Sequence, residues 1–129
     1  NELIPYIQKE FNPNIIETLD RLSELVLDEE DYMEKATEKA FLEVLIEQEN
    51  TKIVLNLKEF NKFEHVIKTR IIMNTTKILF GTSNGLEKKH VEDIIKLCGN
   101  NIGNKFLMPN KYYKISVKSG KVNFERLSY

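Results

Sequence analysis

Between Pro13 and Thr51 the sequence contains no glycine or proline, and its apolar residues recur at intervals of three, four or seven positions. This spacing places them along one side of an α-helix. Asn12 and Pro13 suit a helix start, because asparagine caps free N–H groups and proline lacks the N–H that would be unpaired there. We expect one long helix or two closely joined ones, with its apolar stripe buried. The stripe consists of Ile15, Leu19, Leu22, Val26, Met33, Ala36, Ala40 and Val44.

The periodicity changes after Thr51. Residues 53–57 alternate in a way that predicts a strand packed mainly on one face. Helical spacing returns over residues 63–80, where Phe63, Ile67, Ile71 and Ile78 share one side, and Gly81 should end this helix. A second short helix is predicted over residues 87–98, with a capping box formed by Asn84 and Glu87 and an end at Gly99.

The last part of the sequence has the character of β-structure. A short strand ends at Pro109, and a hairpin follows with its turn at Ser119-Gly120. Alternation predicts two faces: Tyr113, Ile115, Val117, Val122 and Phe124 toward the core, and Lys114, Ser116, Lys118 and Lys121 toward water. The predicted class is α+β, with long N-terminal amphipathic helices followed by two shorter helices and a small antiparallel β-sheet.

Length and composition indicate a single domain, residues 1–129, that functions in the cytoplasm. A chain of 129 residues is large enough for one core, and its apolar runs are too short to span a membrane. Nothing at its start suggests an export signal. Its one cysteine, Cys98, cannot form an internal disulfide, which favours a reducing compartment.

The charges are unevenly distributed along the chain. Residues 1–50 hold 4 basic and 14 acidic side chains, for a net charge of −10, and residues 51–129 carry a net charge of +9. We therefore divide the domain into an acidic helical part, 1–50, and a basic α+β part, 51–129. Such asymmetry lets one part face phosphate, but it equally fits two solvated faces that neutralise each other.

The sequence lacks the residue patterns of a catalytic or metal site. It contains no Cys-x-x-Cys, His-Glu-x-x-His or Gly-x-Ser-x-Gly motif, and no glycine pair is followed by the Lys-Ser/Thr of a phosphate loop. His65 and His90 have no second nitrogen or sulfur ligand at helical spacing, so we expect capping or surface roles for them. Cys98 should be buried rather than nucleophilic.

Basic residues in the second part form the candidate binding site, since lysine and arginine neutralise nucleic-acid phosphates. Arg70, Asn74 and Lys77 fall on one polar stripe of the predicted 63–80 helix. Lysine-rich faces also occur as plain solvated surface or as protection of edge strands. The candidate phosphate-binding residues are Lys68, Arg70, Lys77, Lys88, Lys89, Lys105, Lys111 and Lys114.

Two long stretches resemble the bacterial tRNA(Ile)-lysidine synthetases. "NELIPYIQKEFNPNIIETLDRLSELVLDEEDYMEK" is similar to the segment after their catalytic domain, where Leu-Ile-Pro is followed by Asn-Pro-Asn and an Arg-Leu-x-Glu-x-Leu element. The second runs from "HVIKTRII" through "EKKHVEDIIKL" to "GNKFLMPNKYYKISVKSGKVNF" and resembles their central domain. Here Met108-Pro109-Asn110 matches a Leu-Pro-Asn/Gly element. The resemblance covers nearly the whole chain.

The resemblance implies that the chain is part of an ATP-dependent ligase that attaches lysine to an anticodon cytidine of isoleucine tRNA. The family's nucleotide-binding motif, Ser-Gly-Gly-x-Asp-Ser, is absent. It belongs to a catalytic domain that would precede Asn1. ATP and magnesium are thus implied for the parent enzyme, and no cofactor for these residues. The implied role of this part is to bind and orient tRNA.

Two other functions fit the same pattern of elements. A winged helix would place the predicted 87–98 helix in a DNA major groove. Its exposed residues, however, include no arginine, asparagine or glutamine to read base edges; they are Lys88, Lys89, Glu92, Asp93 and Lys96. Alternatively, the long amphipathic helix could belong to a protein-interaction module that pairs with a partner or with a second copy as a homodimer.

Overall fold

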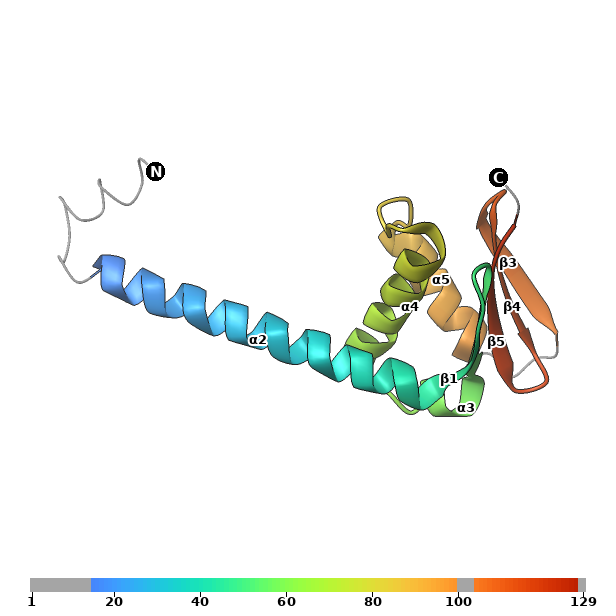
Figure 1. Cartoon of the computed structure of the whole chain (residues 1–129), viewed down its shortest axis with the longest axis horizontal. Coiled ribbons are helices and arrows are strands. Elements are labelled where there is room, and N and C mark those ends of the chain that lie inside the picture. The colour runs from blue at the N-terminus through green and yellow to red at the C-terminus, as the bar shows by residue number, and fades with distance from the viewer. Residues whose placement is uncertain (1–14, 100–103, 128–129) are drawn as a thin grey trace. The chain divides into compact units, whose positions relative to one another are not determined.

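The computed structural model describes residues 15–99 and 104–127 (Figure 1). The predicted helix start at Asn12 and Pro13 lies outside the described residues. The chain divides into two units, residues 1–35 and residues 36–129. Within residues 15–99 and 104–127, no helix has both the length and the apolar character needed to cross a bilayer.

The described part of the chain confirms the α+β class. A single long helix, α2 (Ile15–Val44), comes first. It is followed by two strands, β1 (Leu45–Gln48) and β2 (Lys52–Asn56), and by the one-turn helix α3 (Leu57–Phe60). Next come α4 (His65–Phe80) and α5 (Lys88–Gly99), and then three strands, β3 (Lys105–Asn110), β4 (Tyr113–Lys118) and β5 (Lys121–Arg126).

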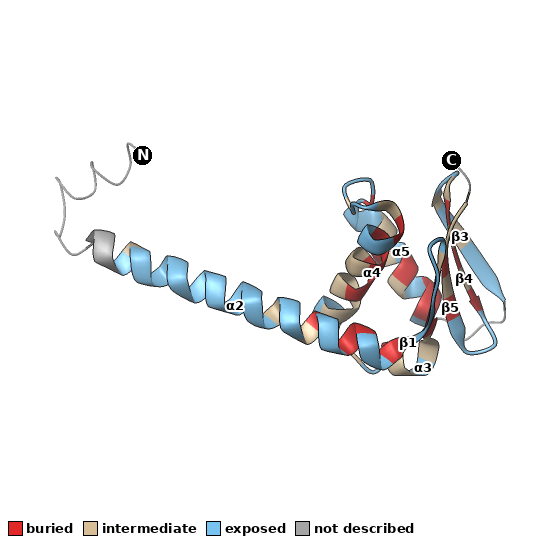
Figure 2. Cartoon of the chain, in the orientation of Figure 1, coloured by how far each residue is buried: buried red, intermediate tan, exposed pale blue. Residues whose placement is uncertain are grey.

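The apolar stripe of α2 is buried only near the helix end. Ala40, Phe41 and Val44 lie in the core, whereas Leu22 is 53% exposed and Val26 is 63% exposed (Figure 2). The prediction that Leu22 and Val26 are buried is therefore wrong for the described chain. Periodicity identifies the apolar side of a helix, but burial requires another element to pack against that side.

The five strands form one antiparallel sheet in the order β1-β2-β5-β4-β3. Its first strand corrects the prediction of a helical part extending to residue 50, because Leu45 to Gln48 pair with β2 instead. A tight turn joins β1 to β2: the backbone N–H of Glu49 donates to the carbonyl of Lys52 at 2.7 Å, and a reciprocal contact of 3.4 Å runs from Lys52 to Glu49.

The predicted hairpin turn at Ser119-Gly120 is confirmed. Lys118 pairs with Lys121, so the loop has two residues, and both have left-handed backbones with φ of 52° at Ser119 and 75° at Gly120. Positive φ at both central residues is the geometry that matches the right-handed twist of two paired strands. The local sequence therefore sets the register of β4 against β5.

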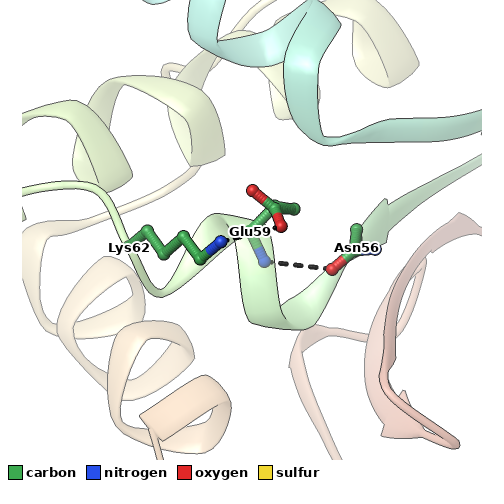
Figure 3. A network of polar contacts seen from close by, with 3 residues as sticks. All are labelled: Asn56, Glu59 and Lys62. Carbon is green, nitrogen blue, oxygen red and sulfur yellow. Dashed lines mark hydrogen bonds and ion pairs between the residues drawn. The ribbon is translucent and has the colours of Figure 1, made fainter.

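Asn56, the last residue of β2, caps the start of α3. The Asn56 side-chain oxygen accepts a hydrogen bond from the backbone N–H of Glu59 at 3.0 Å, and Lys62 Nζ lies 3.0 Å from Glu59 Oε1 (Figure 3). Asparagine at this position satisfies a donor that the first turn of a helix leaves free. The strand predicted to end at Leu57 therefore ends one residue earlier, where α3 begins.

Helices α4 and α5 lie on one side of the sheet (Figure 1) and pack on its inward-facing residues. All five side chains of β4 and β5 that were predicted to face the core are buried; they are Tyr113, Ile115, Val117, Val122 and Phe124. In α4 the buried residues are Ile71, Ile72, Thr75, Thr76 and Leu79. Ile78 is 41% exposed, so its predicted place on the packed side of this helix is wrong.

The ends of α4 and α5 follow from local chemistry. Gly81, with φ of 81°, ends α4 as predicted and donates its N–H to the Lys77 carbonyl at 2.7 Å. The Asn84–Glu87 capping box is not formed. Instead α5 begins at Lys88, and His90 Nδ1 accepts a hydrogen bond from the backbone N–H of Glu87 at 3.1 Å. The predicted capping role of His90 is confirmed.

Candidate nucleic-acid interface

Among the described residues, the surroundings of His65 and Cys98 are structural. His65 Nε2 lies 2.9 Å from Glu92 Oε1, and this surface hydrogen bond links the start of α4 to α5. In residues 15–99 and 104–127 no three His, Cys, Asp or Glu side chains are grouped to hold a metal ion. Burial raises the pKa of the Cys98 thiol to about 12, against the opposing charge of Lys68. Cys98 is thus buried and protonated, as a structural cysteine is.

Helix α4 carries its predicted basic residues on two different sides. Arg70, Asn74 and Lys77 follow one stripe, on which Lys77 is exposed and Arg70 and Asn74 are half-buried. Lys68 lies two positions before Arg70, and residues two apart on a helix do not face each other. Lys68 is half-buried and close enough to Cys98 to lower the pKa of its thiol. The structure therefore separates Lys68 from the other two basic residues of this helix.

Two exposed lysines, Lys88 and Lys89, occupy the first turn of α5. Lys89 Nζ lies 3.6 Å from Glu87 Oε2, which offsets part of its charge. Positive charge at a helix start opposes the helix dipole, so an anion bound there would relieve the repulsion.

On the sheet, Lys114 lies on the face opposite the helices and has an aromatic neighbour that the sequence analysis missed. Phe106 pairs with Ser116, a residue of the same outward face, and is 62% exposed. Lys114 Nζ lies 4.9 Å from the centre of its ring. The alternation of inward and outward residues, extended from Ser116 to its partner Phe106 on β3, could have identified this aromatic neighbour. An exposed aromatic ring beside a cation can stack on a nucleic-acid base.

The remaining predicted residues, Lys105 and Lys111, lie at opposite ends of β3. Both are exposed. Lys105 begins the strand, whereas Lys111 follows its last residue and places Nζ 5.1 Å from the centre of the Tyr112 ring. The eight candidates consequently do not form one cluster, and which of them contact phosphate remains a prediction.

A pocket of about 220 Å³ lies between the end of α4, the connection that follows it, and the turn from β3 to β4. Three separate segments supply its walls: Thr76 and Phe80; Thr82, Gly85 and Leu86; and Asn110 and Tyr113. None of these side chains is charged. The Phe80 and Tyr113 rings meet edge to face, with their centres 4.8 Å apart. The pocket lies entirely within the second unit, residues 36–129.

The hydrogen-bond directions around Tyr113 can be assigned. Thr76 Oγ1 lies 2.9 Å from the Ile72 carbonyl and 2.8 Å from the Tyr113 hydroxyl. A carbonyl only accepts, so Thr76 donates to Ile72 and must accept the Tyr113 proton. Burial raises the pKa of Tyr113 above its usual value, so this hydroxyl stays protonated.

Three of the predicted basic residues belong to the segments that form this pocket. Lys77 follows Thr76, Lys111 follows Asn110, and Lys88 comes two residues after Leu86. Neighbouring Cα atoms are about 3.8 Å apart, so each lysine begins close to a wall of the pocket. All three lysines are exposed. Each of these three lysines is therefore close in sequence to a residue that lines the pocket.

Comparison with individual known proteins places the chain in a family, although no family model matches it. It is 36% identical over 106 residues to a tRNA(Ile)-lysidine synthase of Clostridioides difficile, an alignment that covers 82% of this chain and 23% of that protein. Similar enzymes of Clostridium acetobutylicum (38% over 109 residues, 84% and 23%) and Clostridium perfringens (33% over 121 residues, 89% and 25%) also match. The chain spans about a quarter of the length of these relatives. By its sequence, therefore, the chain belongs to the tRNA(Ile)-lysidine synthase family.

Proposed function

We propose that these residues bind and orient isoleucine tRNA for a lysidine-forming ligase whose catalytic groups lie in another part of the parent protein. The observation that carries this proposal is the match of over 80% of the chain to enzymes named for tRNA(Ile) and lysidine. The net charge of +9 on residues 51–129 supplies the attraction to phosphate. ATP and magnesium would be used by a preceding catalytic domain in the cytoplasm, where tRNA is found.

RNA is favoured over duplex DNA by the chemistry of the exposed groups. The exposed residues of α5 are Lys88, Lys89, Asp93, Lys96 and Gly99, which include no arginine, asparagine or glutamine to make bidentate contacts to base edges in a major groove. Exposed Phe106, by contrast, suits an unpaired base, and unpaired bases are the usual target of sequence-specific RNA recognition.

Salt-dependent titration tests this function. Isoleucine tRNA, an unrelated tRNA and duplex DNA of similar length would be titrated with the chain at several salt concentrations. Each phosphate neutralised by a lysine steepens the salt dependence, so Lys77→Gln or Lys111→Gln should flatten the slope by roughly one unit. Lys35→Gln provides the control, because Lys35 is an exposed lysine of α2 that pairs with Asp31.

Two results would contradict the proposal. Duplex DNA binding as tightly as tRNA at every salt concentration would favour a DNA-binding function instead. Equal slopes for wild type, Lys77→Gln, Lys111→Gln and the Lys35→Gln control would show that these two lysines do not contact phosphate. Both tRNAs should bind similarly, because selection of the anticodon would rest with the catalytic domain.

A further inference from the structure

The size of the pocket between α4, the 81–87 connection and the β3–β4 turn restricts what it can hold. Its volume of about 220 Å³ lies below the roughly 300–1,000 Å³ of clefts that enclose drug-sized ligands. A single small ring system fits this scale better than a whole nucleotide or a folded peptide.

The polar atoms of the pocket offer donors. Tyr113, which is only 1% exposed, gives its proton to Thr76, so these two hydroxyl groups satisfy each other. Asn110 Oδ1 accepts from the backbone N–H of Tyr112 at 2.8 Å, which leaves the Asn110 amide group as a donor. Thr82 Oγ1 accepts from the Asn84 N–H at 3.1 Å, which leaves its own O–H able to donate. A neutral ring with acceptors on its edge complements this set.

The apolar walls favour a flat aromatic ligand over a charged group. Phe80 and Leu86 supply the apolar surface, and no lining side chain could neutralise a phosphate or carboxylate inside the pocket. Burying an uncompensated charge is costly, so an anion would stay outside. Outside, the three wall segments carry the exposed lysines Lys77, Lys88 and Lys111.

From this arrangement we propose that the pocket binds one unstacked base of an RNA, with Lys77, Lys88 and Lys111 attracting the phosphates on either side of that nucleotide. The inference rests on the proposed function and deepens it, because it names an unpaired nucleotide as the feature recognised. Splayed bases in RNA are commonly held by aromatic stacking together with hydrogen bonds to their edges.

Two glycines supply a matched pair of variants. A Cβ at Gly85 would meet nothing within 4 Å and needs no left-handed backbone, so Gly85→Leu adds bulk at the wall of the pocket without requiring a strained backbone. The same holds for Gly99 at the end of α5, which does not line the pocket. Gly99→Leu is therefore the control. Thr82→Val is a second variant, which removes a donor without adding bulk.

The first arm titrates the isotope-labelled chain with the four uncharged nucleosides, with ribose as the control. Backbone amide signals of residues 82–86 and 110–113 should shift with at least one nucleoside, to the same extent at low and high salt, because no charge is involved. Ribose should leave them unchanged. If no nucleoside shifts these signals, the proposal is refuted, whether or not the chain binds tRNA.

The second arm compares an RNA hairpin carrying one unpaired nucleotide with a fully paired hairpin. Gly85→Leu should weaken binding of the first by roughly 5- to 100-fold, the effect of losing one stacked base, and leave its salt slope unchanged. Thr82→Val should weaken it less, and Gly99→Leu not at all. Equal binding by Gly85→Leu and Gly99→Leu would overturn the proposal and leave phosphate binding intact.

Free mononucleotides distinguish the two sources of a base. If they bind the wild-type pocket as tightly as the hairpin with an unpaired nucleotide, the site serves a free nucleotide and the RNA proposal is wrong. Failure of the proposed function has a different signature, which is absence of tRNA binding at every salt concentration while nucleosides still shift the pocket signals.

Discussion

Removing the hydrogen bond between Tyr113 and Thr76 should lower the free energy of unfolding more when Thr76 is replaced than when Tyr113 is replaced. Tyr113→Phe removes a single donor, and Thr76 still donates to Ile72. The free energy of unfolding should therefore fall by about 1 kcal/mol, the usual net value of one hydrogen bond. Thr76→Val removes two bonds and takes away the acceptor of the hydroxyl of Tyr113, a residue that is only 1% exposed. An unsatisfied buried donor costs about 1–3 kcal/mol, so this variant should lose more.

Urea titration followed by circular dichroism would measure both variants and the double variant. With Tyr113→Phe and Thr76→Val combined, no donor is left unsatisfied, so the total loss should be smaller than the sum by about 0.5–1.5 kcal/mol. In a unit of this size each 1 kcal/mol also lowers Tm by roughly 4–8 °C. Tyr32→Phe is the matched control, because Tyr32 is 71% exposed and its change should be within about 0.5 kcal/mol.

The reasoning would be refuted if Thr76→Val cost no more than Tyr113→Phe. That result would mean that Tyr113 does not donate to Thr76, or that its hydroxyl has another acceptor. Additive losses in the double variant would show that the two hydroxyl groups are not coupled.

Three further predictions concern stability and reactivity. Cys98 should resist alkylation at about pH 8 until urea unfolds the chain, and rapid alkylation of the folded protein would contradict its burial. Because the pKa of its thiol is raised from 9.0 to about 12 in the folded state, its contribution to stability is full below pH 9 and falls as the pH rises toward 12. Leu22→Ala should change the unfolding free energy by less than about 0.5 kcal/mol, because Leu22 is exposed, and Phe41→Ala should lower it by about 3–5 kcal/mol, because Phe41 is buried. Equal losses of unfolding free energy, measured by urea titration, would show that the apolar stripe of α2 around Leu22 is packed. Gly120→Ala should lower thermal stability by about 1–2 kcal/mol, whereas Gly85→Ala should not, and a neutral Gly120→Ala would argue against the left-handed turn.

Elements that depend on a few neighbouring residues could be predicted from the sequence. The turn at Ser119-Gly120 and the helix end at Gly81 both need backbone conformations that glycine adopts without strain. Alternation along β4 and β5 identified their buried side chains. Strand β1 was missed, because Leu45 to Gln48 show no clear alternation and become a strand only by pairing with β2.

The residue types of the candidate site could be predicted from the sequence, but the positions of these residues in space could not. Counting charges identified the basic residues, but not that Lys68 is half-buried near Cys98 while Lys77 is exposed. Phe106 could have been placed beside Lys114 by extending the alternation across the sheet. The pocket could not be foreseen, because its walls come from segments about thirty residues apart in the sequence.

The sequence by itself determined the helical and extended periods, the turns, the separation of acidic from basic residues, and the family resemblance that the comparisons support. These properties follow from the preferences of single residues and their near neighbours. Tertiary structure alone decided how far the stripe of α2 is buried, which of the candidate lysines are exposed, and that Thr76, Asn110 and Tyr113 surround one pocket. The physical reason is that burial and proximity depend on packing between distant segments, which local preferences do not specify.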